Sequence, residues 1–291
     1  MSCCARFDGR LSDLSDTGLK IKRGGQVWPS LLWLVDLKQY TGIRLNALLD
    51  PMHLLIPAAG SGKRMGAAVN KLLLPLLGQP ILAWTLQAAD QASSIEWIGI
   101  LSQPGDWPAI EQILAAMDLS TPVQLLQGGA TRQESVYRGV EYLYNLGTVE
   151  RVLIHDGARC LATPKLFDRC SAALQQVDGL IAGIPVKDTI KVAEAGPKGI
   201  QIQSTPERSR LWAAQTPQGF RLSMLWQAHR EALAQGWQVT DDAALFEKLG
   251  WPVYIVEGEE SNLKLTTPLD VLLAAQILQQ RLGPARYSLL I

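Results

Sequence analysis

Apolar and polar residues alternate along this chain in blocks that predict strands and helices in turn. From Met52 onward, short and nearly continuous apolar runs are each followed by a longer segment with the periodicity and caps of a helix. This order is typical of a mostly parallel sheet with helices on both faces, so we predict one doubly wound α/β domain over residues 52–291. Its predicted strands are His53–Pro57, Trp97–Leu101, Val123–Leu126, Val152–His155, Leu180–Ile184 and Val253–Val256.

Threonine caps support the predicted helices. The candidate starts are Thr131 with Glu134 in a capping box, Thr163 and Thr267 each followed by proline, and Thr240 followed by Asp241 and Asp242.

One segment departs from this order. Asp188–Glu194 and Ile200–Gln203 alternate apolar and polar positions, and Ala195–Gly199 between them has the composition of a turn. We predict a protruding β-hairpin arm over about residues 186–208. Because an isolated two-stranded hairpin is marginally stable in water, it should pack on its own domain or on a second subunit.

Residues 1–51 lack the pattern of the rest of the chain. Their apolar stretch Leu31–Val35 is too short to span a membrane, and no secretory signal is arranged there. Asp8 and Asp36 are acidic where transit peptides avoid acid. We expect the folded protein to begin at Met52, which leaves residues 1–51 as a flexible tail or as upstream sequence that is not translated.

The composition is that of an ordinary globular protein. Of 291 residues, 47% are hydrophobic and 19% charged, and 27 Lys and Arg residues balance 27 Asp and Glu residues. This balance excludes the global basic field that binds nucleic acid, and no apolar run approaches a membrane span. The 4 cysteines lack metal-site spacing and are expected to be free thiols in a reducing, cytoplasmic location.

A glycine-rich loop after the first predicted strand carries the first candidate chemistry. It runs from Pro57 to Gly66 as Pro-Ala-Ala-Gly-Ser-Gly-Lys-Arg-Met-Gly, and Lys71 follows it. Bare backbone amides, backed by the charges of Lys63, Arg64 and Lys71, can bind phosphate, so the expected ligand is a polyphosphate. The alternative is a tight turn with surface cations.

Two better-known phosphate loops do not fit. A Walker loop needs glycine at the position of Pro57 and Ser or Thr at that of Arg64. A dinucleotide fingerprint needs glycine at the position of Met65 and an acidic residue after the next strand.

Asp156 directly follows the predicted strand Val152–His155, so it lies at the carboxyl edge of the sheet, where ligands of open α/β folds bind. A carboxylate there can hold Mg²⁺ against phosphate oxygens, because Mg²⁺ takes one or two protein carboxylates and leaves its other positions to phosphate and water. The alternative is a turn or helix cap. His155, the preceding strand residue, should face the opposite side.

Further along, Gly128-Gly129 form a second glycine turn before the capped helix. A base or sugar could lie against its backbone, and the alternative is a plain turn between a strand and a helix.

With these motifs the chain resembles the 2-C-methyl-D-erythritol 4-phosphate cytidylyltransferases, Rossmann-like nucleotidyltransferases of the non-mevalonate isoprenoid pathway. The resemblance covers nearly all of residues 52–291. Matching positions, in order, are Pro57–Gly60, Arg64–Met65, Lys71, Gly128–Gly129, Arg132, Ser135, His155–Asp156, Ala158–Arg159, Asp188–Thr189, Thr216–Gln218, Thr240–Asp241 and Asn262–Lys264.

The resemblance implies roles for these positions. Those implied around the cytidine are Ala58, Ala59, Gly60, Gly129 and Ser135. The triphosphate is implied to contact Arg64 and Lys71, and Mg²⁺ to bind Asp156. The methylerythritol phosphate is implied to contact Arg159, Thr240 and Lys264, together with Thr189 and Arg208 from the arm of a partner subunit, which implies a homodimer. This chain departs from many members at Ala130, where they carry Asp, so one side-chain contact to the cytidine is missing.

The implied reaction is attack of a phosphate monoester on the α-phosphorus of CTP, which gives 4-CDP-2-C-methyl-D-erythritol and pyrophosphate. Because the attacking oxygen is already anionic, positioning and charge suffice, with Arg64 and Lys71 as the catalytic cations. The rivals are a ribitol 5-phosphate cytidylyltransferase, a non-catalytic nucleotide-binding module and a nicotinamide-dependent dehydrogenase. Arg64, Lys71 and Asp156 together argue against the module, and the glycine spacing argues against the dehydrogenase.

A chain that begins at Met52 should keep the activity and the melting temperature of the full chain, because residues 1–51 lack any periodic pattern. Both proteins would be compared by thermal unfolding and by turnover. A large loss in either measurement would show that the extension is part of the folded enzyme.

Overall fold

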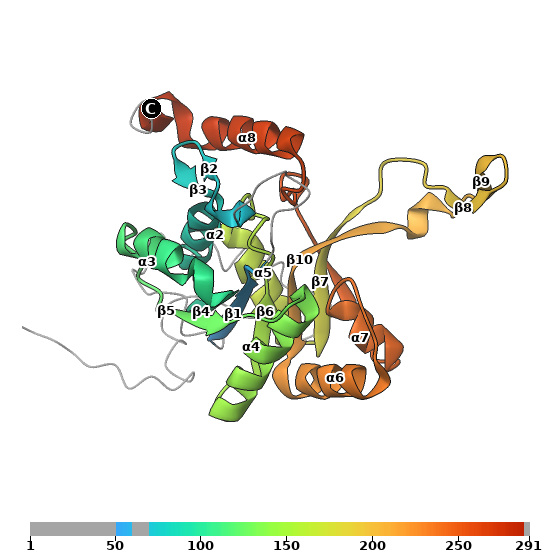
Figure 1. The fold of residues 1–291 in the computed structure, drawn as a ribbon, viewed down its shortest axis with the longest axis horizontal. Helices are drawn as coiled ribbons and strands as arrows, with labels where there is room; N and C mark the ends of the chain where they lie inside the picture. Colours follow the sequence, from blue (N-terminus) through green and yellow to red (C-terminus); the bar gives the residue numbers. More distant parts are fainter. Residues whose placement is uncertain (1–50, 60–69, 288–291) are drawn as a thin grey trace, which may run out of the picture. The chain divides into compact units, whose positions relative to one another are not determined.

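The computed structural model describes residues 51–59 and 70–287, which belong to one of the two units of the chain, residues 45–291. A seven-stranded sheet lies at its centre in the order β11-β7-β10-β6-β1-β4-β5 (Figure 1). All neighbouring strands are parallel except β10, which runs antiparallel to β6 and β7. The prediction of a doubly wound, mostly parallel sheet is confirmed.

The strands of this sheet are β1 (Met52–Pro57), β4 (Ile95–Ser102), β5 (Val123–Gln127), β6 (Arg151–Ile154), β7 (Gly179–Pro185), β10 (Trp212–Arg221) and β11 (Tyr254–Glu257). The helices are α2 (Ile81–Asp90), α3 (Trp107–Ala115), α4 (Arg132–Leu146), α5 (Pro164–Leu174), α6 (Leu222–Gln235), α7 (Ala243–Lys248) and α8 (Pro268–Tyr287). Short 3-10 turns lie at η4 (Lys71–Leu73), η5 (Pro104–Asp106) and η6 (Arg208–Arg210), and β2 (Pro75–Leu76) pairs with β3 (Gln79–Pro80). No helix in this part of the chain is long and apolar enough to cross a membrane.

Helices cover both faces of the sheet, and β1 shows why the sequence requires this. Leu54 and Ile56 pack into one buried cluster with α2, α5 and α8, whereas Leu55 packs into another with α4, α6 and α7 (Figure 1). Successive strand residues point to opposite faces, so a strand that is apolar throughout is stable only between two layers.

The predicted caps hold the helices that lead into the site. Thr131 Oγ1 accepts a hydrogen bond from Glu134 N at 3.0 Å, and Glu134 Oε2 accepts one from Ala130 N at 2.7 Å. Thr163 Oγ1 accepts one from Leu166 N at 3.3 Å at the start of α5. Both helices therefore begin directly after loops at the carboxyl edge of the sheet.

β10 is the one central strand that the apolar pattern did not predict. Gln215, Thr216 and Gln218 are buried within it, and its pairing with β7 shifts between Gln215 and Gln218. The strand inserts between β6 and β7 and carries these polar groups toward the end of β6.

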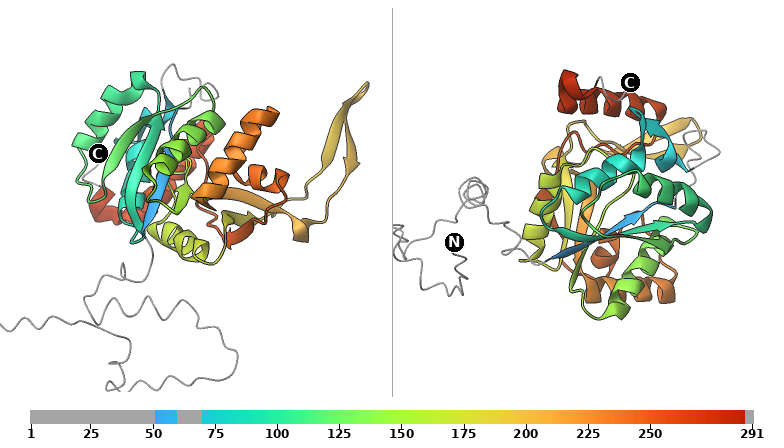
Figure 2. Two further views of the ribbon diagram at one scale, coloured as in Figure 1. Left: turned by 90° about the horizontal axis from the view of Figure 1, so that it is seen from below. Right: turned by 90° about the vertical axis from the view of Figure 1, so that its left-hand side faces the viewer.

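The predicted arm is present as a separate hairpin of β8 (Val192–Gly196) and β9 (Gly199–Ser204), which extends from the ends of β7 and β10 (Figure 2). Its first strand begins at Val192 rather than Asp188. At the other end the pairing continues to Gly196 and Gly199, so the turn between the strands is shorter than the predicted Ala195–Gly199. Ile200 is 83% exposed and Ile202 59%. A hairpin with such exposed apolar positions is not stabilised by its own domain.

Candidate active site

Asp156 lies just beyond the carboxyl end of β6 and is the centre of the candidate site. Its side chain is buried, and each carboxylate oxygen accepts a hydrogen bond from a cation. Arg132 Nε donates to Oδ1 at 2.9 Å, and Lys264 Nζ donates to Oδ2 at 2.6 Å. Arg132 is the first residue of α4, and Lys264 lies between β11 and α8, so distant parts of the chain meet at this carboxylate.

These two cations keep Asp156 ionised. Burial acts to raise the pKa of this carboxyl, but the charges of Arg132 and Lys264 outweigh it and hold the pKa of Asp156 well below its ordinary value. Arg132 also donates from Nη1 to Oδ2 of the fully buried Asp242 at 2.8 Å. Burial acts to raise the pKa of Asp242 too, and Arg132 again outweighs it and lowers that pKa. Two ionised carboxylates thus share one arginine.

The backbone of Asp156 is fixed by β10. Asp156 N donates to Thr216 Oγ1 at 3.0 Å, and the same hydroxyl lies 3.1 Å from His155 Nδ1. His155 is fully buried, with its ring 4.8 Å from that of Phe167, and its Nε2 lies 3.1 Å from the carbonyl oxygen of Arg159. His155 therefore faces the core, as expected, and supports the turn that carries Asp156.

Lys71 reaches the same edge of the sheet. Its Nζ donates to the carbonyl oxygen of Leu265 at 3.0 Å, next to Lys264. Leu265 N in turn donates to the carbonyl oxygen of Ala158 at 2.9 Å, which ties this segment to the turn after β6. The structure thus brings together Lys71, Lys264 and Asp156, all of which were sequence predictions.

The positions predicted for the cytidine form a second group. Gly129 N donates to Ser135 Oγ at 2.9 Å. A β-carbon on Gly128 would lie 3.0 Å from Cβ of Ala59 and 3.2 Å from Ser135 Oγ, so a larger residue at this position would push the two segments slightly apart. Ala58 lies next to Ala59 and is buried. Four of the five residues predicted for the cytidine are therefore neighbours, and the fifth, Gly60, lies outside the described residues, as does Arg64.

Arg159 has no carboxylate partner within the described residues. Its guanidinium donates to the carbonyl oxygens of Asn262 at 2.8 Å and Ala214 at 3.2 Å. Burial lowers the pKa of Arg159, but an arginine remains a cation at neutral pH. A half-buried cation whose hydrogen bonds go only to neutral carbonyl groups is suited to bind an anion.

The residues predicted to come from the arm are not joined to this group within one chain. Arg208 is exposed and donates to the carbonyl oxygen of Lys187 at 2.9 Å, and Thr189 is exposed. Among the described residues no hydrogen bond or ion pair connects either to Arg159 or Lys264. Thr240 is exposed and lies two residues before Asp242, in the segment that leads into α7.

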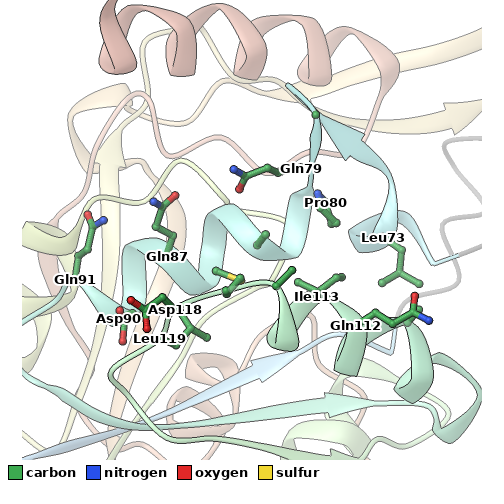
Figure 3. Close-up of a pocket in the computed structure, with 15 residues that line it drawn as sticks. Leu73, Gln79, Pro80, Gln87, Asp90, Gln91, Gln112, Ile113, Asp118 and Leu119 are labelled. Carbon is green, nitrogen blue, oxygen red and sulfur yellow. The ribbon is translucent and has the colours of Figure 1, made fainter. Parts of the chain in front are cut away.

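A separate cavity of about 780 Å³ lies between α2 and α3 (Figure 3). Its lining includes Asp90 and Asp118 and, among the described residues, no lysine or arginine. It is therefore not suited to a polyphosphate, and none of the described site residues lines it.

Sequence reasoning missed the role of Asp242 and the strand β10, although Thr216–Gln218 within that strand were among the matching positions. Asp242 was expected only to mark a helix start, and its contact with Arg132 spans 110 positions of the chain. No local pattern reports a partner at that distance. The one hint of this contact in the sequence was chemical. Arg132 belongs to the predicted motif, and an arginine that is buried there is expected to have an acidic partner.

Comparisons with known proteins agree on one family. The family model for 2-C-methyl-D-erythritol 4-phosphate cytidylyltransferase matches residues 52–280. A protein of that name from Synechococcus sp. (strain JA-3-3Ab) is 96% identical over 235 residues, which are 81% of this chain and 100% of that protein. Its counterpart from Nostoc punctiforme is 62% identical over 230 residues, 79% of this chain and 99% of that protein. The crystal structure of 4-diphosphocytidyl-2C-methyl-D-erythritol synthase from Anaerococcus prevotii covers 79% of this chain and 99% of its own, with a TM-score of 0.69 at 31% identity.

The buried His155 should make folding stability depend on pH. Burial lowers its pKa to about 4, whereas an unfolded histidine titrates near about 6.5. The folded state stays neutral while the unfolded state takes up a proton, so the stabilisation is complete above about pH 6.5 and is lost as the pH falls toward about 4. Between pH 7 and 5, the unfolding free energy of the wild type should fall by about 2 kcal/mol more than that of His155→Asn. Equal pH slopes in urea titrations would contradict a neutral, buried His155.

Proposed function

The chain belongs to the 2-C-methyl-D-erythritol 4-phosphate cytidylyltransferase family and is a nucleotidyltransferase of isoprenoid precursor biosynthesis, and we propose how its own residues transfer CMP from CTP to 2-C-methyl-D-erythritol 4-phosphate. The observation that carries the proposal is the ionised Asp156 between Arg132 and Lys264 at the carboxyl end of β6. It lies at the edge where nucleotides bind in this class of fold.

The cytidine binds against the closely packed segments of Ala58–Ala59 and Gly128–Gly129, and Gly60 is predicted to take part in the same contact. Ser135 holds the amide of Gly129 in place, and backbone groups there read the base, because Ala130 has no polar side chain. Lys71 and Arg64 contact the triphosphate. The position of Lys71 supports this role, because its side chain contacts the residue after Lys264, at the same edge of the sheet as Asp156.

Asp156 is the residue that would hold Mg²⁺. No cluster of three or more His, Cys, Asp or Glu residues suited to a metal occurs in the described part of the chain. One carboxylate suffices for Mg²⁺ when phosphates and water fill the remaining positions. A carboxylate has about four acceptor positions, of which the bonds from Arg132 and Lys264 use two, so the residues fit the ion. When bound, Mg²⁺ supplies positive charge to the phosphate oxygens.

The acceptor phosphate approaches from the side of Arg159 and Lys264. One of its oxygens forms a bond to the α-phosphorus of CTP while the bond from that phosphorus to the bridging oxygen of pyrophosphate breaks, so no proton has to be removed first. The cations Lys71, Arg64 and Lys264 bind the anions and stabilise the charge that moves to the leaving group. The products are 4-CDP-2-C-methyl-D-erythritol and pyrophosphate.

The working form is a homodimer in which the arm of each subunit completes the site of the other. Thr189 and Arg208 contact the acceptor from the partner, together with Arg159, Thr240 and Lys264. The exposed isoleucines of the arm and the absence of a described contact between Arg208 and its own site support this arrangement.

The enzyme works in the cytoplasm. Residues 1–51 are not needed for the reaction, since the family match begins at Met52.

The function is tested by supplying CTP and Mg²⁺ with methylerythritol phosphate, ribitol phosphate or glycerol phosphate, and by following pyrophosphate release. Methylerythritol phosphate should be the preferred acceptor, and preferred turnover of ribitol phosphate would contradict the proposed acceptor.

In the same assay Asp156→Asn should lower kcat by about 10²-fold or more, because it keeps the shape of the side chain but removes its charge. Its melting curve serves as the folding control. An unchanged Mg²⁺ dependence in that variant would assign the metal to another residue.

The shared site predicts complementation between inactive chains. Arg208→Ala and Lys71→Ala chains should each be poor alone, but a mixed dimer has one site in which both residues are intact. Random pairing makes about half of the dimers mixed, so activity should recover to about a quarter of the wild-type value. If subunit exchange is demonstrated and activity does not recover, Arg208 serves its own subunit.

A further inference from the structure

Arg132 is held from two sides by carboxylates of different elements. Its Nε donates to Asp156 at 2.9 Å and its Nη1 to Asp242 at 2.8 Å, so the guanidinium gives Asp156 one hydrogen bond rather than two. Asp242 directly precedes α7 and is fully buried. Two parallel hydrogen bonds to a single carboxylate are the geometry that arginine otherwise favours. A further contact is therefore needed to keep this guanidinium bonded to Asp156 and Asp242 at the same time.

Asp242 is itself fixed by contacts outside the substrate-binding residues. Its amide donates to Gln218 Oε1 on β10 at 3.2 Å, and Gln218 Nε2 donates to Asp241 Oδ2 at 2.8 Å. Its Oδ1 lies 3.4 Å from Nε2 of His229 on α6, and both side chains are 1% exposed. Neither of these two atoms has a hydrogen-bond partner in the described part of the chain, so each is the nearest available partner of the other.

Removal of the Asp242 charge would change how many hydrogen bonds Asp156 accepts from the surrounding cations. At present two cations, Arg132 and Lys264, contact two carboxylates, Asp156 and Asp242. Without the second carboxylate, Arg132 Nη1 would be left buried without an anionic acceptor, which is unfavourable. Rotation onto Asp156 would satisfy it, and Arg132 and Lys264 together would then use about three of the four acceptor positions of that carboxylate instead of two, which leaves less room for a metal.

We propose that Asp242, supported by His229, is a positioning residue that holds Arg132 to a single hydrogen bond and so keeps Asp156 open to the metal and phosphates. The proposal rests on the metal role of Asp156 in the proposed function. Asp242 contacts no substrate in this scheme and acts only through Arg132.

The direct test is Asp242→Asn, which keeps the shape of the side chain and removes its charge. In its crystal structure the guanidinium of Arg132 should contact Asp156 through two nitrogens. The dissociation constant of Mn²⁺ from the enzyme with CTP, followed by electron paramagnetic resonance, should rise about 10- to 100-fold. Asp168→Asn is the control, because it removes the charge of a carboxylate that accepts a hydrogen bond from Ser94 N at 2.9 Å and has no hydrogen bond or ion pair with Arg132 among the described residues. Its Mn²⁺ affinity should be that of the wild type.

Either of two results overturns the proposal: Arg132 remains in place in Asp242→Asn, or Mn²⁺ affinity in that variant equals that of the wild type while Asp156→Asn weakens it. If Asp156→Asn also leaves Mn²⁺ affinity unchanged, the metal role of Asp156 in the proposed function fails instead. The position of Arg132 in the crystal then decides the positioning role by itself.

Substitutions at His229 provide a second test if Asp242→Asn does not fold. His229→Gln keeps an amide N–H that can donate to Asp242, whereas His229→Leu removes the donor. Mn²⁺ affinity should fall in His229→Leu and return toward the wild-type value in His229→Gln. Equal affinities in the two variants would remove His229 from the proposal.

Discussion

The site depends on a carboxylate that is both buried and ionised. A charge taken out of water is costly unless cations and hydrogen bonds surround it, so Asp156 can stay charged only where Arg132 and Lys264 reach it together. Arg132 comes from α4 and Lys264 from the segment before α8, while Thr216 on β10 fixes the amide of Asp156. The fold must therefore bring a helix start, a strand inserted in the opposite direction and a late loop to the end of β6.

Both substrates are anions, and the groups that the described residues offer at this edge are fixed cations rather than a chemical nucleophile. Lys71, Lys264 and Arg159 lie around the edge of the sheet, and each is held by backbone carbonyls or by Asp156. Cys160 and Cys170 are buried, which raises the pKa of each thiol to about 12, so neither is available as a thiolate. His155 is enclosed against Phe167. Catalysis in this site is the positioning of two anions at one phosphorus.

Much of this could be predicted from the sequence, because the determining patterns are local. Strands such as β1 are buried on both faces and are therefore apolar apart from His53 near the start of β1. Thr131 and Thr163 mark helix starts by their own hydrogen bonds. β10 was missed because its interior is polar, and Gln215 and Gln218 are satisfied only by distant partners in the segments before α7 and α8. Asp242 was missed for the same reason. The arm was predicted as a hairpin, but its proposed role depends on a second chain, about which one sequence contains no local signal.

The central claim is that CMP passes directly from CTP to the acceptor phosphate, with no covalent intermediate on the protein. The most direct measurement uses CTP in which sulfur replaces one non-bridging α-oxygen in a known configuration, and determines the configuration at phosphorus in the product. A single in-line displacement predicts inversion. Retention would require two displacements, and hence a cytidylylated residue in the enzyme, which would contradict a site that works by positioning and charge alone.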